Sequence, residues 1–191
     1  MVRLRRHRGV LILLLLAGWL LAACGQDEDS TMKNTTDRPS METVVDDYTQ
    51  MTTEMLAAVD EVAGVRDWQP GRNDALSGSA CKDAEPGGKG QEVSLPSRKS
   101  TGSLTDIDRK ALSEAVWGVG RAHGFDTTGT TVDRPDDFEI FGEDAYGARY
   151  VFHTARNTVL GIRTGCHVWD TPPPPAPTPT GVPDYAQKDK D

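Results

Sequence analysis

The residues most able to do chemistry in this chain are its three cysteines, and the first stands at the end of a leader-like segment. Cys24 directly follows Leu21-Ala22-Ala23 and closes an apolar stretch, 10–23, which four arginines precede. The stretch is far shorter than the roughly 20 residues of a spanning helix, so it predicts a cleaved signal peptide rather than a transmembrane anchor. The small residues before the cysteine let a peptidase approach the backbone closely. The pattern predicts lipidation of the Cys24 thiol, with a mature chain that begins there.

The lipid prediction sets where the protein works. The alternative is an ordinary secretory signal with an accidental cysteine. Arg5-Arg6 gives a weak hint of twin-arginine export, although the residues around this pair fit that motif poorly. Two acyl chains on one cysteine give a durable anchor where a single chain is only marginal. We therefore expect the protein to reach the membrane through its N-terminal lipid, on the outer, extracytoplasmic face.

Cys81 and Cys166 form an even pair in that oxidising setting, where disulfides form and persist. We predict that they are bonded to each other. The bridge would close a loop of about 85 residues and, in chain-entropy terms, stabilise the fold by up to roughly 4.6 kcal/mol. The alternatives are two free thiols or a metal pair; no Cys-x-x-Cys or Cys-His spacing indicates zinc, although His167 adjoins Cys166.

Other motifs predict no catalytic, cofactor-binding or metal-binding residues. The chain has neither a nucleophile elbow nor a phosphate loop, and its glycines at 118–124 fall at a predicted helix end rather than between a strand and a helix. His123, His153 and His167 have no partner at metal-ligand spacing. A Ser/His/Asp site assembled from distant residues stays open, because such triads are defined by geometry rather than by order.

The net charge of the mature chain limits the kinds of partner that we expect. The chain has 21 Lys+Arg and 29 Asp+Glu, and the leader removes four arginines and no acid, so the mature part carries a formal charge of −12. Such acidity argues against nucleic acid and against a domain that lies flat on anionic lipid. We expect the lipid to act as a tether, and the acidity to serve solubility.

Composition divides the chain into four parts. The residues between the leader and the first predicted helix are almost all polar, which predicts a disordered stalk, and the prolines at 172–175, 177, 179 and 183 predict an extended tail outside the core. We expect a signal peptide at 1–23, the stalk at 24–39, one extracytoplasmic domain at 40–170 and a proline-rich disordered tail at 171–191.

Two helices are predicted inside the domain. Ser40 is a good N-cap, and apolar residues recur at alternating spacings of three and four up to Gly64, a natural helix end. This stripe favours packing on a sheet over a coiled coil. A second helix is predicted from Thr105 as N-cap to His123, with Gly124 ending it and Phe125 folding back on the last turn.

After the second predicted helix, the spacing of the apolar residues changes from the helical 3.6 toward two, which is typical of strands. Short strands are expected at 92–95, 130–132, 138–141, 148–154 and 159–166, with short connections that favour antiparallel neighbours. Trp68 is expected to anchor the loop-rich segment between the helices. We predict an α+β fold, in which an antiparallel meander of about four to five strands packs one face against both helices and is held by a Cys81–Cys166 disulfide.

Several segments together resemble a known family. The residues at 79–83, 104–125, 144–152 and 159–166, with the proline-rich end, are similar to LppA-type lipoproteins of mycobacteria and related actinobacteria. The resemblance supports the lipid site and the disulfide, which fall at matching places. It supplies no reaction and no catalytic residues.

We expect a membrane-anchored lipoprotein that is a noncatalytic binding or interaction module of the cell envelope, with a protein or other ligand as partner and no cofactor. The alternative is an envelope hydrolase whose site is built from residues distant in sequence. A histidine within reach of both a carboxylate and a hydroxyl would favour the hydrolase.

Overall fold

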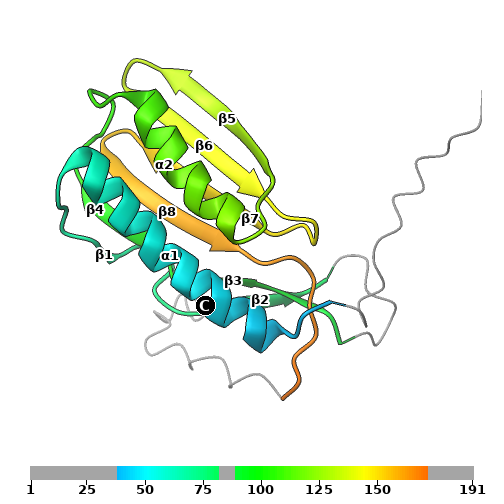
Figure 1. Cartoon of the computed structure of the whole chain (residues 1–191). Helices are drawn as coiled ribbons and strands as arrows, with labels where there is room; N and C mark the ends of the chain where they lie inside the picture. The colour runs from blue at the N-terminus through cyan, green and yellow to red at the C-terminus, as the bar shows by residue number, and fades with distance from the viewer. Residues whose placement is uncertain (1–37, 82–88, 172–191) are drawn as a thin grey trace, which may run out of the picture. The chain divides into compact units, whose positions relative to one another are not determined.

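Two α-helices lie side by side on one face of an antiparallel sheet in the computed structural model (Figure 1). The structure describes residues 38–81 and 89–171; Cys24, the leader, and most of the predicted stalk and tail lie outside these residues. In chain order the elements are α1 (Met41–Ala63), β1 (Gln69–Pro70), β2 (Ser77–Ala80), β3 (Gln91–Ser94), β4 (Arg98–Thr101), α2 (Arg109–Ala122), β5 (Thr127–Arg134), β6 (Asp137–Glu143), β7 (Arg149–Thr154) and β8 (Asn157–Arg163).

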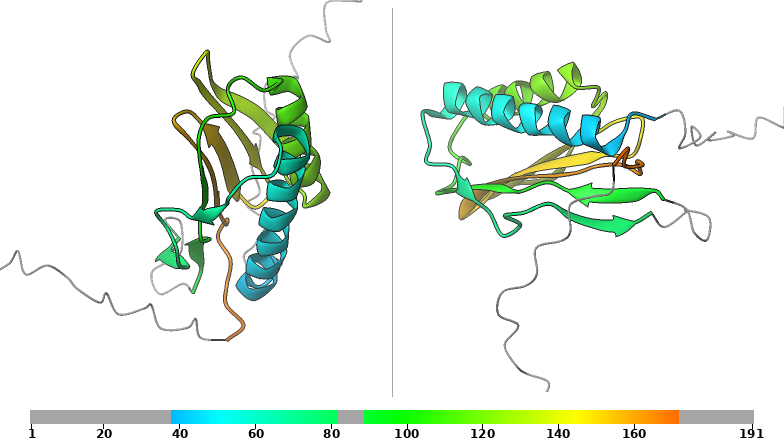
Figure 2. Two further views of the ribbon diagram at one scale, coloured as in Figure 1. Left: turned by 90° about the vertical axis from the view of Figure 1, so that its left-hand side faces the viewer. Right: turned by 90° about the horizontal axis from the view of Figure 1, so that it is seen from below.

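The sheet runs in the order β1-β4-β8-β7-β6-β5, and β2 and β3 form a side arm that joins β8 through Ser94 and Arg163. The α+β class with both helices on one face is confirmed (Figure 2), and the expected meander is present as β5 to β8. The expected four to five strands are wrong, because the described residues form eight. β1, β2 and β4 have two to four residues and bury at most one side chain each, so they lack the alternation that identifies a strand.

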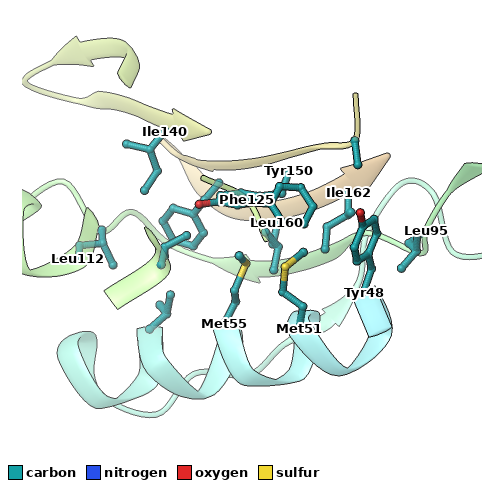
Figure 3. Close-up of a cluster of buried hydrophobic side chains, with 14 of the residues drawn as sticks. Tyr48, Met51, Met55, Leu95, Leu112, Phe125, Ile140, Tyr150, Leu160 and Ile162 are labelled. Carbon is teal, nitrogen blue, oxygen red and sulfur yellow. The ribbon is translucent and has the colours of Figure 1, made fainter. Parts of the chain in front are cut away.

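The first helix, α1, forms where the sequence predicts it. Ser40 accepts a hydrogen bond from the Thr43 backbone N–H at 3.5 Å as N-cap, and Gly64 follows the helix at a φ of +81°, which favours glycine. The apolar stripe points into the core (Figure 3). Its buried members are Met41, Val44, Tyr48, Met51, Thr52, Met55 and Val59.

The second helix, α2, begins later than the sequence indicates. Thr105 is not its N-cap: Asp108 is, and its carboxylate accepts from the backbone N–H groups of Lys110 and Ala111 at 2.9 and 3.2 Å. Two N–H groups bound by one carboxylate satisfy more of the helix end than a single hydroxyl would. The predicted ending is confirmed, with Gly124 at a φ of +83° and Phe125 fully buried.

Tyr150 of β7 is fully buried in the core between α2 and the sheet. Its ring centroid lies 5.2 Å from that of Phe125, which lies 5.1 Å from that of Tyr48. Two glycines make room for it, Gly120 on α2 and Gly142 on β6: a methyl group on Gly120 would stand 2.7 Å from Tyr150 Cε1. The close approach of α2 to the sheet thus depends on the missing side chain.

The two ends of the described chain meet at the start of α1, in a region that we call the terminal junction, residues 38–42 and 165–171. The Met41 backbone N–H donates to the Val168 carbonyl oxygen at 2.9 Å. The Glu42 carboxylate accepts from the last two described backbone N–H groups at 3.0 and 2.9 Å, which lowers its pKa to about 2. The first and last described residues are therefore held together in one region of the domain.

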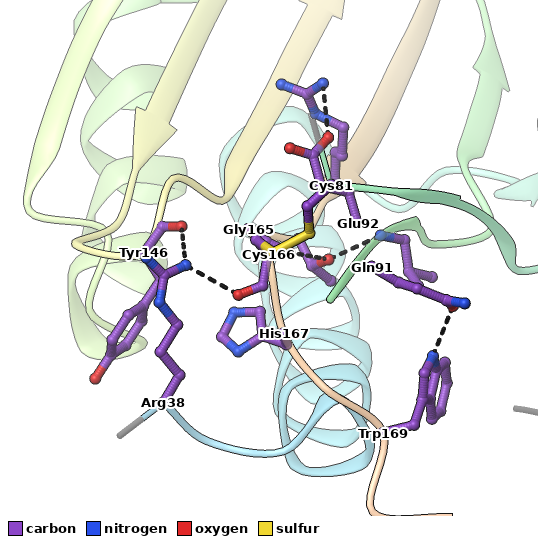
Figure 4. The surroundings of a disulfide bond; sticks show 12 residues. Arg38, Cys81, Gln91, Glu92, Tyr146, Gly165, Cys166, His167 and Trp169 are labelled. Carbon is purple, nitrogen blue, oxygen red and sulfur yellow. Dashed lines mark hydrogen bonds and ion pairs between the residues drawn. A yellow bond between two sulfur atoms is a disulfide. The ribbon is translucent and has the colours of Figure 1, made fainter. Parts of the chain in front are cut away.

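A disulfide between Cys81 and Cys166 covers the same region, as the sequence predicts (Figure 4). Their Cα atoms lie 5.8 Å apart across a sequence separation of 85 residues. Gly90 packs so closely on the bridge that a methyl group there would stand 2.7 Å from the Cys166 sulfur. Arg38 adds a hydrogen bond to the Cys166 carbonyl oxygen at 2.9 Å. The Gln91 backbone N–H donates to the His167 carbonyl oxygen at 2.8 Å.

We predict opposite effects for alanine at two glycines of α2. Gly120→Ala drives a methyl group into Tyr150 and lowers the free energy of unfolding by about 1–3 kcal/mol. Gly118→Ala, where the added methyl meets nothing within 4 Å, raises it by up to about 1 kcal/mol because alanine favours the helix. Urea unfolding measures both, and equal effects of the two variants would contradict the packing of Tyr150 under α2.

Candidate binding site

The face of the sheet opposite the helices is open in the described part of the chain (Figure 2). Alternate residues of β6, β7 and β8 are buried toward the helices, and the residues between them point to this open face and are almost all half-buried. Two cross-strand rows matter here: Phe141, Val151 and Gly161, and beside it Glu143, Arg149 and Arg163. The open face therefore carries an apolar row next to a charged one.

A groove of about 410 Å³ lies on this open face, and we call it the sheet groove. Val151 and Gly161, which pair directly across β7 and β8, line it, and nothing lies within 4 Å of the place where a Gly161 side chain would begin. Asn73, Ser94 and Ser97 line it as well. The groove thus combines a shallow apolar surface with polar groups.

The polar side of the sheet groove is held in place by its own hydrogen bonds. The Ser97 backbone N–H donates to the Asn73 carbonyl oxygen at 2.7 Å, and the Asn73 backbone N–H donates to Ser97 Oγ at 3.2 Å. Asn73 Nδ2 donates to the Leu95 carbonyl oxygen at 3.1 Å. These bonds fix the loop before β2 against the turn between β3 and β4, so the groove exists without a ligand to shape it.

Arg149 and Arg163 also line the sheet groove, and they are a directly opposed pair on β7 and β8. Arg149 forms an ion pair with Glu143 on β6, and its guanidinium lies 3.9 Å from the centroid of the Phe141 ring. Arg163 Nη1 lies 3.4 Å from a carboxylate oxygen of Glu92 on β3. These two carboxylates belong to the strands that flank the β7–β8 pair, β6 and β3, so each arginine has one acidic partner on the side of its strand away from the other arginine.

A second groove, of about 360 Å³, lies between α1 and the turn before β4. Threonines of α1 line it together with Leu56, Trp68 and Arg98. Trp68, expected to be a core anchor, packs against the core only in part, and its Nε1 donates to Asp60 at 3.0 Å. One arginine without a second cation makes this groove a weaker candidate for recognition of a polar ligand.

The three histidines do not bring a carboxylate and a hydroxyl together in the described residues. His123, at the end of α2, contacts Asp47 and Glu54 on α1 at 2.8 and 2.9 Å. His153 on β7 forms a hydrogen bond with the Asp137 carboxylate, at 2.8 Å. The geometry that would favour a hydrolase is thus not found at any of them.

His167 is fully buried beside the disulfide. Its Nδ1 donates to the Pro39 carbonyl oxygen at 2.9 Å, its ring meets the Tyr146 ring edge to face, and its Nε2 has no hydrogen-bond partner among the described residues. Burial lowers the pKa of His167. A neutral histidine that fastens the terminal junction explains this position.

His123 links the two helices electrostatically. Burial alone lowers its pKa, but hydrogen bonds and charge from Glu54 and Asp47 outweigh the burial and raise the pKa above its ordinary value. The same contact lowers the pKa of Glu54. Only the protonated ring donates from both nitrogens, so the bridge between α1 and α2 is complete only when His123 is charged.

The comparisons with known proteins agree with this fold. A family model described as "LppA: Lipoprotein confined to pathogenic Mycobacterium" matches residues 23–170. The chain belongs to the LppA family. No curated protein matches it significantly.

Two crystal structures share the LppA fold with this chain. LppA from Mycobacterium tuberculosis is 14% identical, with a TM-score of 0.56 over 76% of this chain and 90% of that one. A DUF4853 family protein from Actinomyces odontolyticus is 16% identical, with a TM-score of 0.51 over 72% of this chain and 73% of that one. At these identities the likeness concerns the fold alone.

The structure describes two of the three site residues that the sequence predicts. Cys81 and Cys166 are joined, whereas Cys24 lies outside the described residues. Within the ranges described, no helix is long and apolar enough to cross a bilayer, and no group of three or more potential metal ligands gathers. Sequence reasoning missed Arg149 and Arg163; the signal that could have found them is that each takes an outward position in an alternating strand.

We predict that His123→Gln destabilises this LppA-family protein in a pH-dependent way. Because the folded pKa of His123 is raised, its stabilisation is complete below the unfolded value near 6.5 and is lost as the pH rises through the folded value. Wild type should exceed the variant by about 1–2 kcal/mol in free energy of unfolding at pH 6, and the gap should shrink toward pH 9.

Chemical denaturation across this pH range measures the gap. The matched control keeps the histidine and removes both carboxylates, as Asp47→Asn with Glu54→Gln, and should lose the same pH dependence. A gap that is constant, or that grows toward pH 9, would show that the bridge is not charge-dependent.

Proposed function

We propose that this protein is a noncatalytic binding module of the cell envelope, held at the outer face of the cell membrane by a lipid on Cys24, with the sheet groove as its binding site. The family of lipoproteins to which it belongs supports the lipid. The leader, with its small residues directly before Cys24, supports the position of that lipid.

The terminal junction supports a tethered arrangement. The first described residues are pinned to the last ones by the Met41–Val168 hydrogen bond, and the disulfide lies beside them. The start of the domain is therefore held by hydrogen bonds to the segment that carries Cys166 of the disulfide. A domain held in this way keeps its sheet groove in shape while it is attached to a membrane.

The observation that carries the binding role is the sheet groove itself. A sheet in a protein of this size usually hides its apolar residues, yet here Phe141 and Val151 lie on a face that no described helix covers. The groove is preformed, has polar and charged groups at its edges, and has no histidine among the described residues that line it. Binding fits these features better than hydrolysis does.

Cys24→Ser tests the tether. We expect the variant to be released into the medium or to stay unprocessed, because no acyl chains hold it in the membrane. Cell fractionation and mass measurement of the N-terminal segment check this. Unchanged membrane retention of the serine variant would contradict the lipid site.

Gly161→Leu tests the sheet groove. The added side chain starts in open space, so the fold tolerates it, but it fills the surface between Val151 and the loop before β2. We expect co-sedimentation of the mature protein with isolated cell-envelope material to fall at least about 10-fold, because the lost contact surface is worth more than about 1.4 kcal/mol. The protein is produced as residues 24–191 with Cys24→Ser, so that it carries neither the leader nor the lipid.

Gly118→Leu is the matched control. It adds the same side chain at an exposed glycine of α2 where the structure also has open space. This variant should sediment like wild type. Equal sedimentation of wild type and both leucine variants, or none from wild type, would rule out the sheet groove as the binding site.

A further inference from the structure

Two arginines that face each other across neighbouring strands are an unfavourable arrangement by themselves. Residues directly opposite in an antiparallel pair hold their Cβ atoms about 4.5–5.5 Å apart, and like charges there destabilise the sheet. Arg149 and Arg163 are such a pair, and both point to the open face. A structure keeps such a pair at low cost only when negative groups lie near both guanidinium groups.

Within the described residues, each arginine has one acidic partner, which lies on a flanking strand on the side away from the other arginine. Glu143 meets Arg149 from β6, and Glu92 meets Arg163 from β3 at 3.4 Å. Each arginine makes one hydrogen bond to a side chain within the described residues, through one of the five N–H groups of a guanidinium. N–H donors of both arginines thus stay available toward the sheet groove that both residues line.

The Phe141 ring holds one of the two arginines in position. The guanidinium of Arg149 lies 3.9 Å from the ring centroid, which favours stacking of the planar group. The ring itself packs on Gly129 of β5, where a methyl group would stand 2.8 Å from Phe141 Cε1. Arg149 is therefore oriented before any ligand arrives, which lowers the cost of binding.

From this arrangement we propose that Arg149 and Arg163 bind an oxyanion, a phosphoryl or carboxylate group, of the ligand whose body lies in the sheet groove. The inference rests on the proposed function and adds the chemistry of its ligand. Guanidinium groups match both kinds of oxyanion through paired N–H donors. Val151 and Gly161 offer the adjoining space for the rest of the ligand.

The acidity of the whole chain does not oppose this binding at short range. The mature part carries −12, but charges further apart than about 8–10 Å are screened at physiological ionic strength. The contacts between guanidinium groups and a bound oxyanion are much shorter. Glu143 and Glu92 are the acids that compete directly, and this competition makes a specific test available.

Small probes test the proposal on the lipid-free mature protein. Glycerol phosphate and N-acetylalanine supply a phosphoryl and a carboxylate group, and glycerol and N-acetylalaninamide are their neutral counterparts. Amide chemical-shift titrations should give saturable binding of at least one anionic probe, with a dissociation constant on the order of millimolar for ligands this small. The neutral probes should bind at least 10-fold more weakly. The two anionic arms tell which oxyanion is preferred.

Two sets of variants locate the site. Arg149→Gln with Arg163→Gln should weaken the anionic probe at least 10-fold, whereas Glu143→Gln with Glu92→Gln should tighten it at least two-fold by removing the internal competitors. A purely structural role of the arginines would not produce tighter binding in the second pair. Arg121→Gln with Lys110→Gln is the matched control on α2: it makes the same change in net charge and removes an exposed Arg121–Glu114 pair at 3.4 Å.

The proposal is overturned if neutral and anionic probes bind alike, if no probe binds, or if the arginine pair and the α2 control behave alike. Thermal unfolding of each variant separates lost binding from lost folding. If Gly161→Leu abolishes envelope binding while the arginine variants bind probes like wild type, the sheet groove stands and the oxyanion site falls. If Gly161→Leu has no effect as well, the proposed function falls with it.

Discussion

Both helices pack on the same face of the sheet, and the rest of the structure depends on this arrangement. The apolar stripes of α1 and α2 both pack on one face of the sheet, around Tyr150 and Phe125. Gly120 lets α2 come close to that face. The other face is left to alternate residues of the same strands, which are half-buried and mixed in character. The proposed binding role would then place stability and recognition on opposite sides of one sheet.

The terminal junction gives this two-sided domain a fixed point of attachment. The disulfide between Cys81 and Cys166 joins the β2–β3 arm to the segment after β8, and Arg38 and Met41 add hydrogen bonds from the other chain end. A cross-link over so long a separation removes much freedom from the unfolded chain. Disulfides persist in oxidising compartments, and a small domain gains stability from such a bond.

Much of the fold could be predicted because local signals agree with the tertiary structure. Several features can be recognised from a few neighbouring residues alone. They are the apolar stripe of α1, the helix ends at Gly64 and Gly124, and the alternation of buried residues in β6 to β8. The start of α2 was wrong because Thr105 and Asp108 both have capping side chains, and the better acceptor cannot be chosen without the turn that presents it. The missed strands and the sheet groove depend on pairing between distant segments, which no local pattern encodes.

We infer that the open face of the sheet, rather than the helical face, meets the ligand. Amide chemical-shift mapping of the isotope-labelled, lipid-free mature protein during titration with solubilised envelope material tests it most directly. We expect the shifted amides to cluster in β7, β8 and the loop around Asn73. Shifts confined to α1 and α2, with β7 and β8 unchanged, would contradict it.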